Sequence, residues 1–306
     1  MPALTILHTN DLHACLDQMT RLATLIQRER VQANTEGRHI LLLDAGDSSS
    51  NEVWESRVTG GRANYAMLEA MGYDAVVIGN SDLQWGREPL TRLLTAVHFQ
   101  ILAANLLDAV TDSRPTGLRD YALFKFAQMG SPDPATASVG SDDPTRAYET
   151  AIAVAVIGLA TRDEMHADFR TFDPAKTLRT LIPQMQSEGA QIIVVLSHLG
   201  IETDKKLAAE VPGLHAIAGG HTHTTLREPE FVGETIIVQA GEHGNFLGRL
   251  DLEYGFSTQA VTVKNGGLIP CPEATPPDPT LAGMLELIRF EAEVVRKRAP
   301  GGQVVE

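Results

Sequence analysis

Short apolar runs alternate with longer segments of helical periodicity along most of the chain. The runs LTILH, HILLLDAGD, DAVVIGN, FQILAAN and QIIVVLSH are rich in Leu, Ile and Val and predict strands. Between them apolar residues recur every three or four positions, which predicts helices near residues 19–32, 63–71, 89–96 and 174–188. Because these strands are apolar at nearly every position, we expect a sheet that is buried on both faces. The alternation predicts an α/β fold.

Two stretches depart from this alternation. From about residue 108 to 150, the runs YALFKF and TAIAVAVIGL flank a segment dense in Pro, Gly, Ser and Asp, which predicts a hairpin with a long loop. Further on, TIIVQAGEHGNFLGRLDLEY and QAVTVKNGGLIP predict antiparallel strands. A Pro-rich stretch then precedes a helix predicted over residues 280–298.

Composition and charge narrow the classes of function. The chain has 306 residues, of which 43% are hydrophobic and 21% charged, as in globular proteins. Its net charge of −14 argues against a nucleic-acid polymer as ligand. Small phosphate esters stay compatible, because bound metal ions reverse the charge of an acidic cleft. Cys15 and Cys271 are too few for a disulfide framework, so we expect free thiols.

Targeting features are not expected from this sequence. The N-terminus has no basic segment followed by a long apolar run, and no stretch of about 18 apolar residues occurs. We therefore expect a cytoplasmic protein that has no membrane partner. Oligomeric state is left open.

The candidate chemistry lies where the predicted strands end, which is where open α/β sheets bind their ligands. Seven polar side chains follow strand ends, namely Asp11, His13, Asp47, Asn80, His198, His221 and His223. Oxygen and imidazole donors without thiolates favour Mn, Fe or Zn. On an extended backbone, the spacing of Asp-x-His and His-x-His places both side chains on one side, so each pair is expected to bind one ion. The two carboxylate oxygens of Asp47 suit a bridge between ions.

An isolated His near a strand end is more often structural than a ligand. We interpret the remaining histidines in that way: His8, His39, His98, His166, His215 and His243. Of these, His243 in the Gly-flanked turn GEHGN is the one that could reach the mouth of a site, although a turn contact is the simpler interpretation. Asp44 is interpreted as orienting the DAGD turn.

The motifs follow one order: D-x-H, G-D, G-N, S-H and G-G-H-x-H. This order resembles the calcineurin-like metallophosphoesterases. The surrounding strings, including ILHTNDLHA, YDAVVIGN and VQAGEHGNFLGRLDLE, look more narrowly like the N-terminal catalytic domain of bacterial 5′-nucleotidases and 2′,3′-cyclic-nucleotide phosphodiesterases. The resemblance implies a four-layer α-β-β-α sandwich of two mixed sheets flanked by helices, with the catalytic domain over residues 1–275.

The resemblance also implies two divalent metal ions, of Mn, Zn or Fe. One would be bound by Asp11, His13, Asp47 and His223. The other would be bound by Asp47, Asn80, His198 and His221, so that Asp47 is the bridge. A hydroxide held between the two ions would attack the phosphate ester.

Two features depart from the resemblance. In the nucleotidase group the G-N pair is followed by His, with Asp three residues later, whereas this chain has Ser81 and Gln84. A hydroxyl cannot act as a general acid in the way an imidazole does. We therefore expect the loss of hydrolysis rate to be smallest for diesters and activated esters. Beyond the metals, Asn80 and Ser81 are the candidate catalytic residues. Residues 276–306 are expected to form a linker-like helix, without a C-terminal nucleotide-binding domain.

The favoured hypothesis is a two-metal hydrolase of small phosphate esters, with nucleotides or cyclic nucleotides as candidate substrates. An alternative from a different class is a metal-binding scaffold with weak or no activity on the same fold, supported by Ser81 and Gln84. A third is hydrolysis at sulfur or another centre that is not phosphate, for which fold analogy alone speaks.

Overall fold

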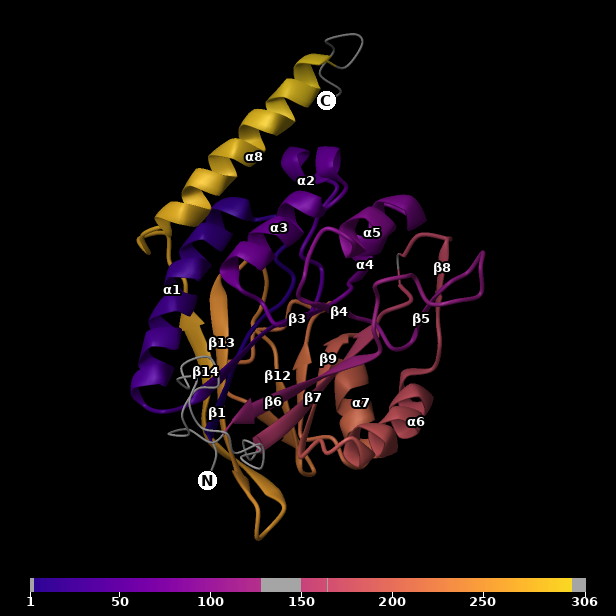
Figure 1. Ribbon diagram of the computed structural model, residues 1–306, viewed down its shortest axis with the longest axis vertical. Coiled ribbons are helices and arrows are strands. Elements are labelled where there is room, and N and C mark those ends of the chain that lie inside the picture. The colour runs from indigo at the N-terminus through magenta and orange to yellow at the C-terminus, as the bar shows by residue number, and fades with distance from the viewer. Residues whose placement is uncertain (1–2, 128–149, 164, 299–306) are drawn as a thin grey trace, which may run out of the picture.

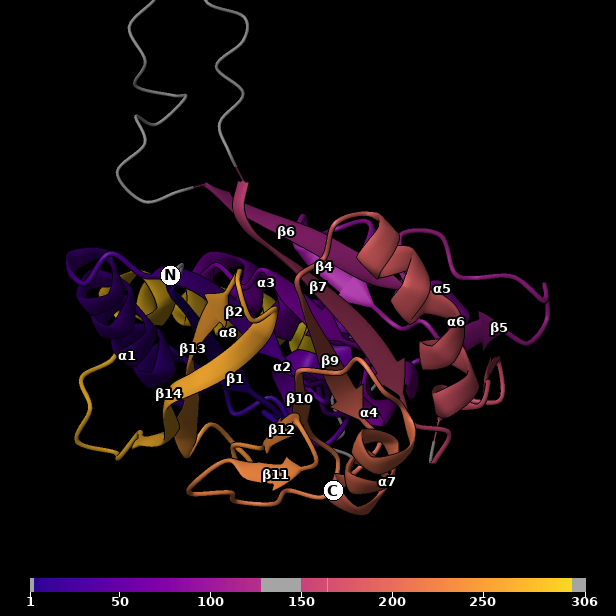
Figure 2. The ribbon, with the colours of Figure 1, turned by 90° about the horizontal axis from the view of Figure 1, so that it is seen from below.

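Two six-stranded sheets pack face to face, and helices cover both outer faces (Figure 1). The computed structural model describes residues 3–127, 150–163 and 165–298. Figure 2 shows the strands lying between α1 (Leu16–Thr35) on one side and α6 (Pro174–Ser187) and α7 (Ile201–Glu210) on the other. The fold is thus the four-layer α-β-β-α sandwich that the family resemblance implied.

Both sheets mix parallel and antiparallel strands. The first has the order β14 (Ala260–Pro270), β13 (Phe246–Gly255), β1 (Ala3–Thr9), β2 (His39–Asp44), β3 (Ala75–Val77), β4 (Gln100–Leu102). The second has the order β11 (Glu230–Val232), β12 (Thr235–Val238), β10 (Ala216–Gly219), β9 (Ile192–His198), β7 (Thr150–Ala160), β6 (Tyr121–Ala127). A short separate pair joins β5 (Leu106–Asp108) and β8 (Phe169–Thr171). In these sheets β1–β4 run parallel, as do β7, β9, β10 and β12.

The continuous apolar strands are explained by burial on both faces. In β9, Val194 and Leu196 pack between the two sheets, whereas Ile193 and Val195 pack against the helix layer of α6 and α7. All four side chains are fully buried. An apolar residue at every position of β9 is therefore what a central strand of this sandwich requires.

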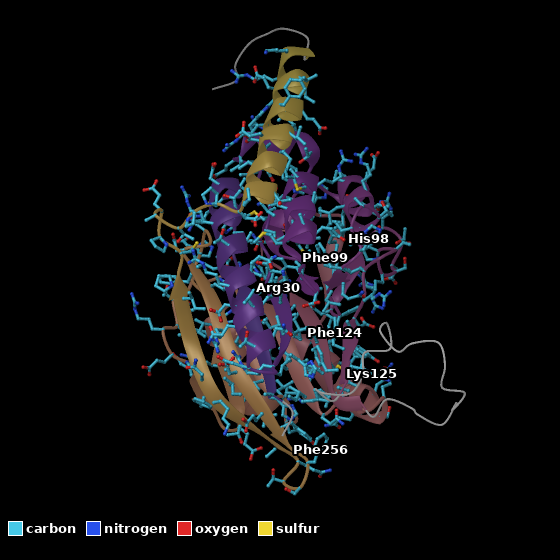
Figure 3. All side chains as sticks on the ribbon, turned by 60° about the vertical axis from the view of Figure 1, so that its left-hand side comes forward. Arg30, His98, Phe99, Phe124, Lys125 and Phe256 are labelled. Atoms are coloured by element: carbon cyan, nitrogen blue, oxygen red, sulfur yellow. The ribbon has the colours of Figure 1, made fainter. Side chains whose placement is uncertain are left out.

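The helix layer on the first sheet is formed by α1 together with α2 (Trp54–Thr59), α3 (Arg62–Met71), α4 (Asn80–Leu83), α5 (Arg87–Leu94) and α8 (Pro279–Arg298). Arg30, labelled in Figure 3, ties α1 to α3 by donating to the carbonyls of Met71 and Gly72 at 2.8 and 2.7 Å. The first half of α8 packs into this layer through Leu281 and Leu285, and its far end extends beyond the body (Figures 1 and 3).

Most of the predicted elements are present, and one expectation was wrong. The hairpin before residue 160 is confirmed, since β6 and β7 pair antiparallel; most of its predicted long loop lies outside the described residues. β13 and β14 are antiparallel as predicted. The TIIV run does not join them, because β12 lies in the other sheet, where it pairs antiparallel with β11 and parallel with β10. No helix in the described part of the chain is long and apolar enough to span a bilayer.

Gly158 of β7 lies against Leu102 of the other sheet, and this contact can be tested by substitution. A Cβ at Gly158 would lie 2.5 Å from Leu102 Cβ. We expect Gly158→Ala to lower the free energy of unfolding by about 1–3 kcal/mol through overpacking. Gly283 in α8 is the control, because a Cβ there meets nothing within 4 Å, and Gly283→Ala should raise stability by about 0.5–1 kcal/mol. Urea unfolding measures the free energy of unfolding of both variants. Equal free energies for the two variants would contradict the account of the contact between the sheets.

Candidate metal centre

The seven predicted side chains come together at the carboxyl ends of five strands. β1, β2 and β3 of the first sheet and β9 and β10 of the second each end just before, or at, one of these residues. Because β1, β2 and β3 run parallel to one another, as do β9 and β10, the carboxyl ends within each set lie on one edge, and the two edges meet at the site.

The first group of donor atoms comes from Asp11, His13 and His223. The Nε2 atoms of the two histidines face each other at 3.1 Å, and Asp11 Oδ1 lies 3.8 Å from His13 Nε2 and 3.4 Å from His223 Nε2. Asp47 Oδ2 lies 3.8 Å from His13 Nε2. Four donor atoms therefore surround one position.

The second group lies on the other side of Asp47. Asn80 Oδ1 is 3.2 Å from His198 Nε2 and 3.1 Å from His221 Nδ1. Asp47 Oδ1 is also 3.2 Å from His198 Nε2. The two oxygens of one carboxylate thus face different groups of donors.

The donor chemistry fits divalent cations. Asp11 and His198 are fully buried and Asp47 is 2% exposed, and buried carboxylates need a counter-charge because their desolvation is costly. Carboxylate, amide and imidazole donors suit Mn, Fe or Zn, and each group offers four of them. Asp11 Oδ1 also lies 4.0 Å from His198 Nε2, so it stands close to both groups.

The backbone around the ligands corrects one sequence expectation. Five of the seven residues have positive φ angles between 44° and 75°, namely Asp11, His13, Asp47, His221 and His223. The Asp-x-His and His-x-His pairs therefore do not lie on extended backbone. The tight left-handed turns direct His221 to the second group and His223 to the first, so this pair does not grip one position together. Such conformations are uncommon for residues other than Gly and persist where the surroundings enforce them.

Two buried carboxylates hold these turns. Asp44, as predicted, orients the DAGD turn: it accepts from Thr9 Oγ1 at 2.6 Å, Ser48 Oγ at 2.8 Å and Gly46 N at 3.0 Å. The sequence reasoning missed Asp82, which joins the two ligand loops.

Asp82 accepts from the backbone N–H groups of Asp47 at 3.1 Å, Ser49 at 3.0 Å and Gly79 at 3.0 Å. Burial raises the pKa of Asp82 to about 6. Gly79 is the N-cap of α4, and an acidic residue three positions after an N-cap is typical of helix capping, so that signal could have identified Asp82.

Asn10 and Glu242 were also missed. Asn10 donates to Asp11 Oδ2 at 2.7 Å and accepts from Ala240 N at 2.7 Å. Glu242 Oε2 lies 2.6 Å from His223 Nδ1. Partners of this kind fix the orientation of a ligand side chain. No spacing rule reveals the bond of Asn10 to Ala240 or that of Glu242 to His223, because both join residues far apart in the sequence.

Three further candidates from the sequence lie at or near the centre. Ser81 donates through both its backbone N–H and its hydroxyl to Asp47. Gln84 is partly buried, and its Oε1 has no hydrogen-bond partner within the described part of the chain. The His243 ring lies 5.7 Å from that of His13 and 6.3 Å from that of His223, so it does reach the mouth of the site.

Charge coupling holds a proton within the second group. Burial alone would lower the pKa of His198, but the facing carboxylates of Asp47 and Asp11 outweigh it and raise this pKa to about 10. His198 Nδ1 donates to the carbonyl of Ala45 at 2.7 Å, which leaves Nε2 directed at Asp47. Burial opposes ionisation of Asp47, yet the attraction of His198 lowers the pKa of Asp47.

The chain is similar to known proteins along nearly its whole length. Residues 4–225 match the family model described as calcineurin-like phosphoesterase. The chain is 30% identical to the trifunctional nucleotide phosphoesterase protein YfkN of Bacillus subtilis, over 97% of this chain and 21% of that protein. It is also 30% identical to a 5′-nucleotidase of Bos taurus, over 99% of this chain and 55% of the relative. The chain therefore spans a fifth to about half of the length of these relatives.

A solved structure has a similar fold. The 5′-nucleotidase precursor from Thermus thermophilus superposes with a TM-score of 0.78 at 25% identity, over 96% of this chain and 60% of that one. Its likeness supports the four-layer arrangement described above.

Proton release on metal binding tests the charge coupling. Since His198 carries a proton below about pH 10 in the metal-free protein, a metal that takes Nε2 must displace it. We expect Mn²⁺ binding near pH 7.5 to release about one proton, and the affinity to rise with pH by up to about tenfold per unit. Calorimetry in two buffers of different ionisation enthalpy measures the release. Binding heats that are the same in both buffers would contradict the assignment.

Proposed function

Because the chain belongs to the calcineurin-like phosphoesterase family of phosphate-ester hydrolases, we propose that it hydrolyses small phosphate esters at a centre of two divalent metal ions. The proposed ligands of the first ion are Asp11, His13, Asp47 and His223. Those of the second ion are Asp47, Asn80, His198 and His221. Mn, Zn and Fe are the candidate metals.

The observation that carries this proposal is the position of Asp47. Its Oδ2 lies toward His13 at 3.8 Å and its Oδ1 toward His198 at 3.2 Å, so one buried carboxylate serves both groups of donors. Bound there, two ions would supply a hydroxide nucleophile near neutral pH and offset the charge that develops on the phosphoryl oxygens.

The chain's own residues orient the reaction. Asn80 uses its amide oxygen toward His198 and His221, and no hydrogen bond between described residues engages its amide N–H groups, so these can donate to a phosphoryl oxygen. Asp82 holds the backbone on both sides of this arrangement through Gly79 and Asp47. We propose Asn80 as the catalytic residue that contacts substrate beyond the metals.

The names of the relatives support nucleotides or cyclic nucleotides as substrates. With Ser81 in place of an imidazole, diesters and activated esters with good leaving groups are favoured, because they need little protonation. The net charge of −14 favours a small substrate over a nucleic-acid polymer. We also propose that residues 1–275 form the catalytic domain and that residues 276–306 contribute the helix α8.

The alternative function is a metal-binding scaffold that has lost activity. It rests on Ser81 and Gln84, which stand where the resemblance expects a His and an Asp. Metal analysis combined with assays on bis-p-nitrophenyl phosphate, p-nitrophenyl phosphate and a nucleotide panel distinguishes the two functions. Two bound metals without turnover would favour the scaffold.

Asp47→Ala tests the proposed bridge. Loss of the shared carboxylate should leave both ions poorly held, so we expect less than one metal per chain and at least about a thousandfold loss of diesterase rate. Metal content after dialysis and hydrolysis of bis-p-nitrophenyl phosphate are the measurements. The control is Asp112→Ala, which removes an exposed carboxylate paired with Arg170 and should leave both unchanged. Turnover retained by Asp47→Ala would refute the bridge.

Ser81→His tests the preference for good leaving groups. At saturating Mn²⁺, an added imidazole could protonate the leaving oxygen, and we expect p-nitrophenyl phosphate to gain less than a phosphomonoester with an alkyl leaving group. For the alkyl ester the gain should approach about a hundredfold. The ratio of the two rates in the variant and the parent protein is the measurement. No gain on the alkyl ester would count against the idea.

A further inference from the structure

Ser81 makes two hydrogen bonds to the same carboxylate. Its backbone N–H donates to Asp47 Oδ1 at 2.8 Å, and its hydroxyl donates to Asp47 Oδ2, also at 2.8 Å. Each oxygen of the Asp47 carboxylate faces a different group of proposed ligands, and each accepts a hydrogen bond from Ser81. Both residues are nearly inaccessible, since Ser81 is 6% and Asp47 2% exposed.

The neighbourhood of Asp47 makes these contacts specific. Gly79 lies directly against the carboxylate, and a Cβ at that position would be 2.1 Å from Asp47 Oδ1. The carboxylate is thus enclosed by Gly79 on one side and by Ser81 on another. Among the described residues, the Ser81 hydroxyl is the one hydrogen-bond donor whose contact with Asp47 Oδ2 is shorter than 3.5 Å.

From this geometry we infer that Ser81 is a positioning residue, whose hydroxyl fixes the rotation of the Asp47 carboxylate so that Oδ2 stays directed at the His13 and His223 side of the centre. Its proton points to Asp47 rather than to the mouth of the site, so Ser81 does not protonate a leaving group. Ser81, which stands where the resemblance expects a His, thereby contributes to metal binding and not to protonation of the substrate. This inference rests on the proposed two-metal centre.

The two halves of the centre depend on Ser81 to different degrees. Asp47 Oδ1 would keep the Ser81 backbone N–H and the neighbouring His198 in any variant at position 81. Asp47 Oδ2 would lose its close donor when the hydroxyl is removed. Removal of the hydroxyl should therefore weaken binding of the ion on the side of Asp11, His13 and His223. The affinity for the other ion should be nearly unchanged.

Titration of the metal-free protein with Mn²⁺, with free Mn²⁺ followed by electron paramagnetic resonance, tests this asymmetry. In Ser81→Ala we expect one of the two binding events to weaken by about 10- to 100-fold, which is the usual effect of removing a partner of a metal ligand. Ser81→Thr keeps the hydroxyl and should bind within a few-fold of the parent chain. Ser50→Ala is the matched control, because the Ser50 hydroxyl accepts only from Glu52 N, at 3.2 Å, among the described residues.

Melting of the metal-free variants separates a folding defect from a loss of positioning. If Ser81→Thr does not fold, the comparison of Ser81→Ala with Ser50→Ala still decides. Unchanged affinities in Ser81→Ala would overturn the inference, as would a Thr variant that folds and binds as weakly as the Ala variant. A parent protein that binds neither Mn²⁺ nor Zn²⁺ would overturn both the inference and the proposed function, whereas two tight sites in Ser81→Ala would overturn the inference alone.

Discussion

Burial of two carboxylates at the meeting edges of the two sheets is the constraint on which the rest of the structure depends. Asp11 is fully buried and Asp47 nearly so, and charges in such a place are costly unless they are paired. In the metal-free state the proton on His198 offsets part of this charge. Two divalent ions would offset it more completely, which is why the electrostatics of the site favour metal binding.

The same constraint explains the strained backbone around the site. The proposed ligand residues at positive φ are held by a network of buried acceptors, in which Asp44 closes the turn after β2 and Asp82 ties that turn to the first turn of α4. Glycine at position 79 lets the two loops approach within contact distance. The rigid sandwich behind them, with β9 buried on both faces, gives these turns a fixed base.

Much of this arrangement could be predicted from sequence, for identifiable reasons. Continuous apolar runs gave the central strands, and polar residues at their ends gave the seven candidate ligands, because a parallel sheet gathers its carboxyl ends. The placement of β12 could not be read from TIIV, since an apolar run does not state which sheet or direction it joins. The spacing of His221 and His223 wrongly placed both on one ion, because their left-handed turns are rare for residues other than Gly, whereas the family resemblance had assigned them to different ions. The long-range contacts of Asn10 with Ala240, of Asp82 with Asp47 and of Glu242 with His223 form between loops that only the fold brings together.

The central claim is that Asp47 stands between two metal ions. Anomalous diffraction at the manganese edge from Mn²⁺-loaded crystals would test it most directly. The account predicts two peaks about 3.5–4 Å apart, one on each side of the Asp47 carboxylate. A single peak, or peaks that leave Asp47 uncoordinated, would contradict it.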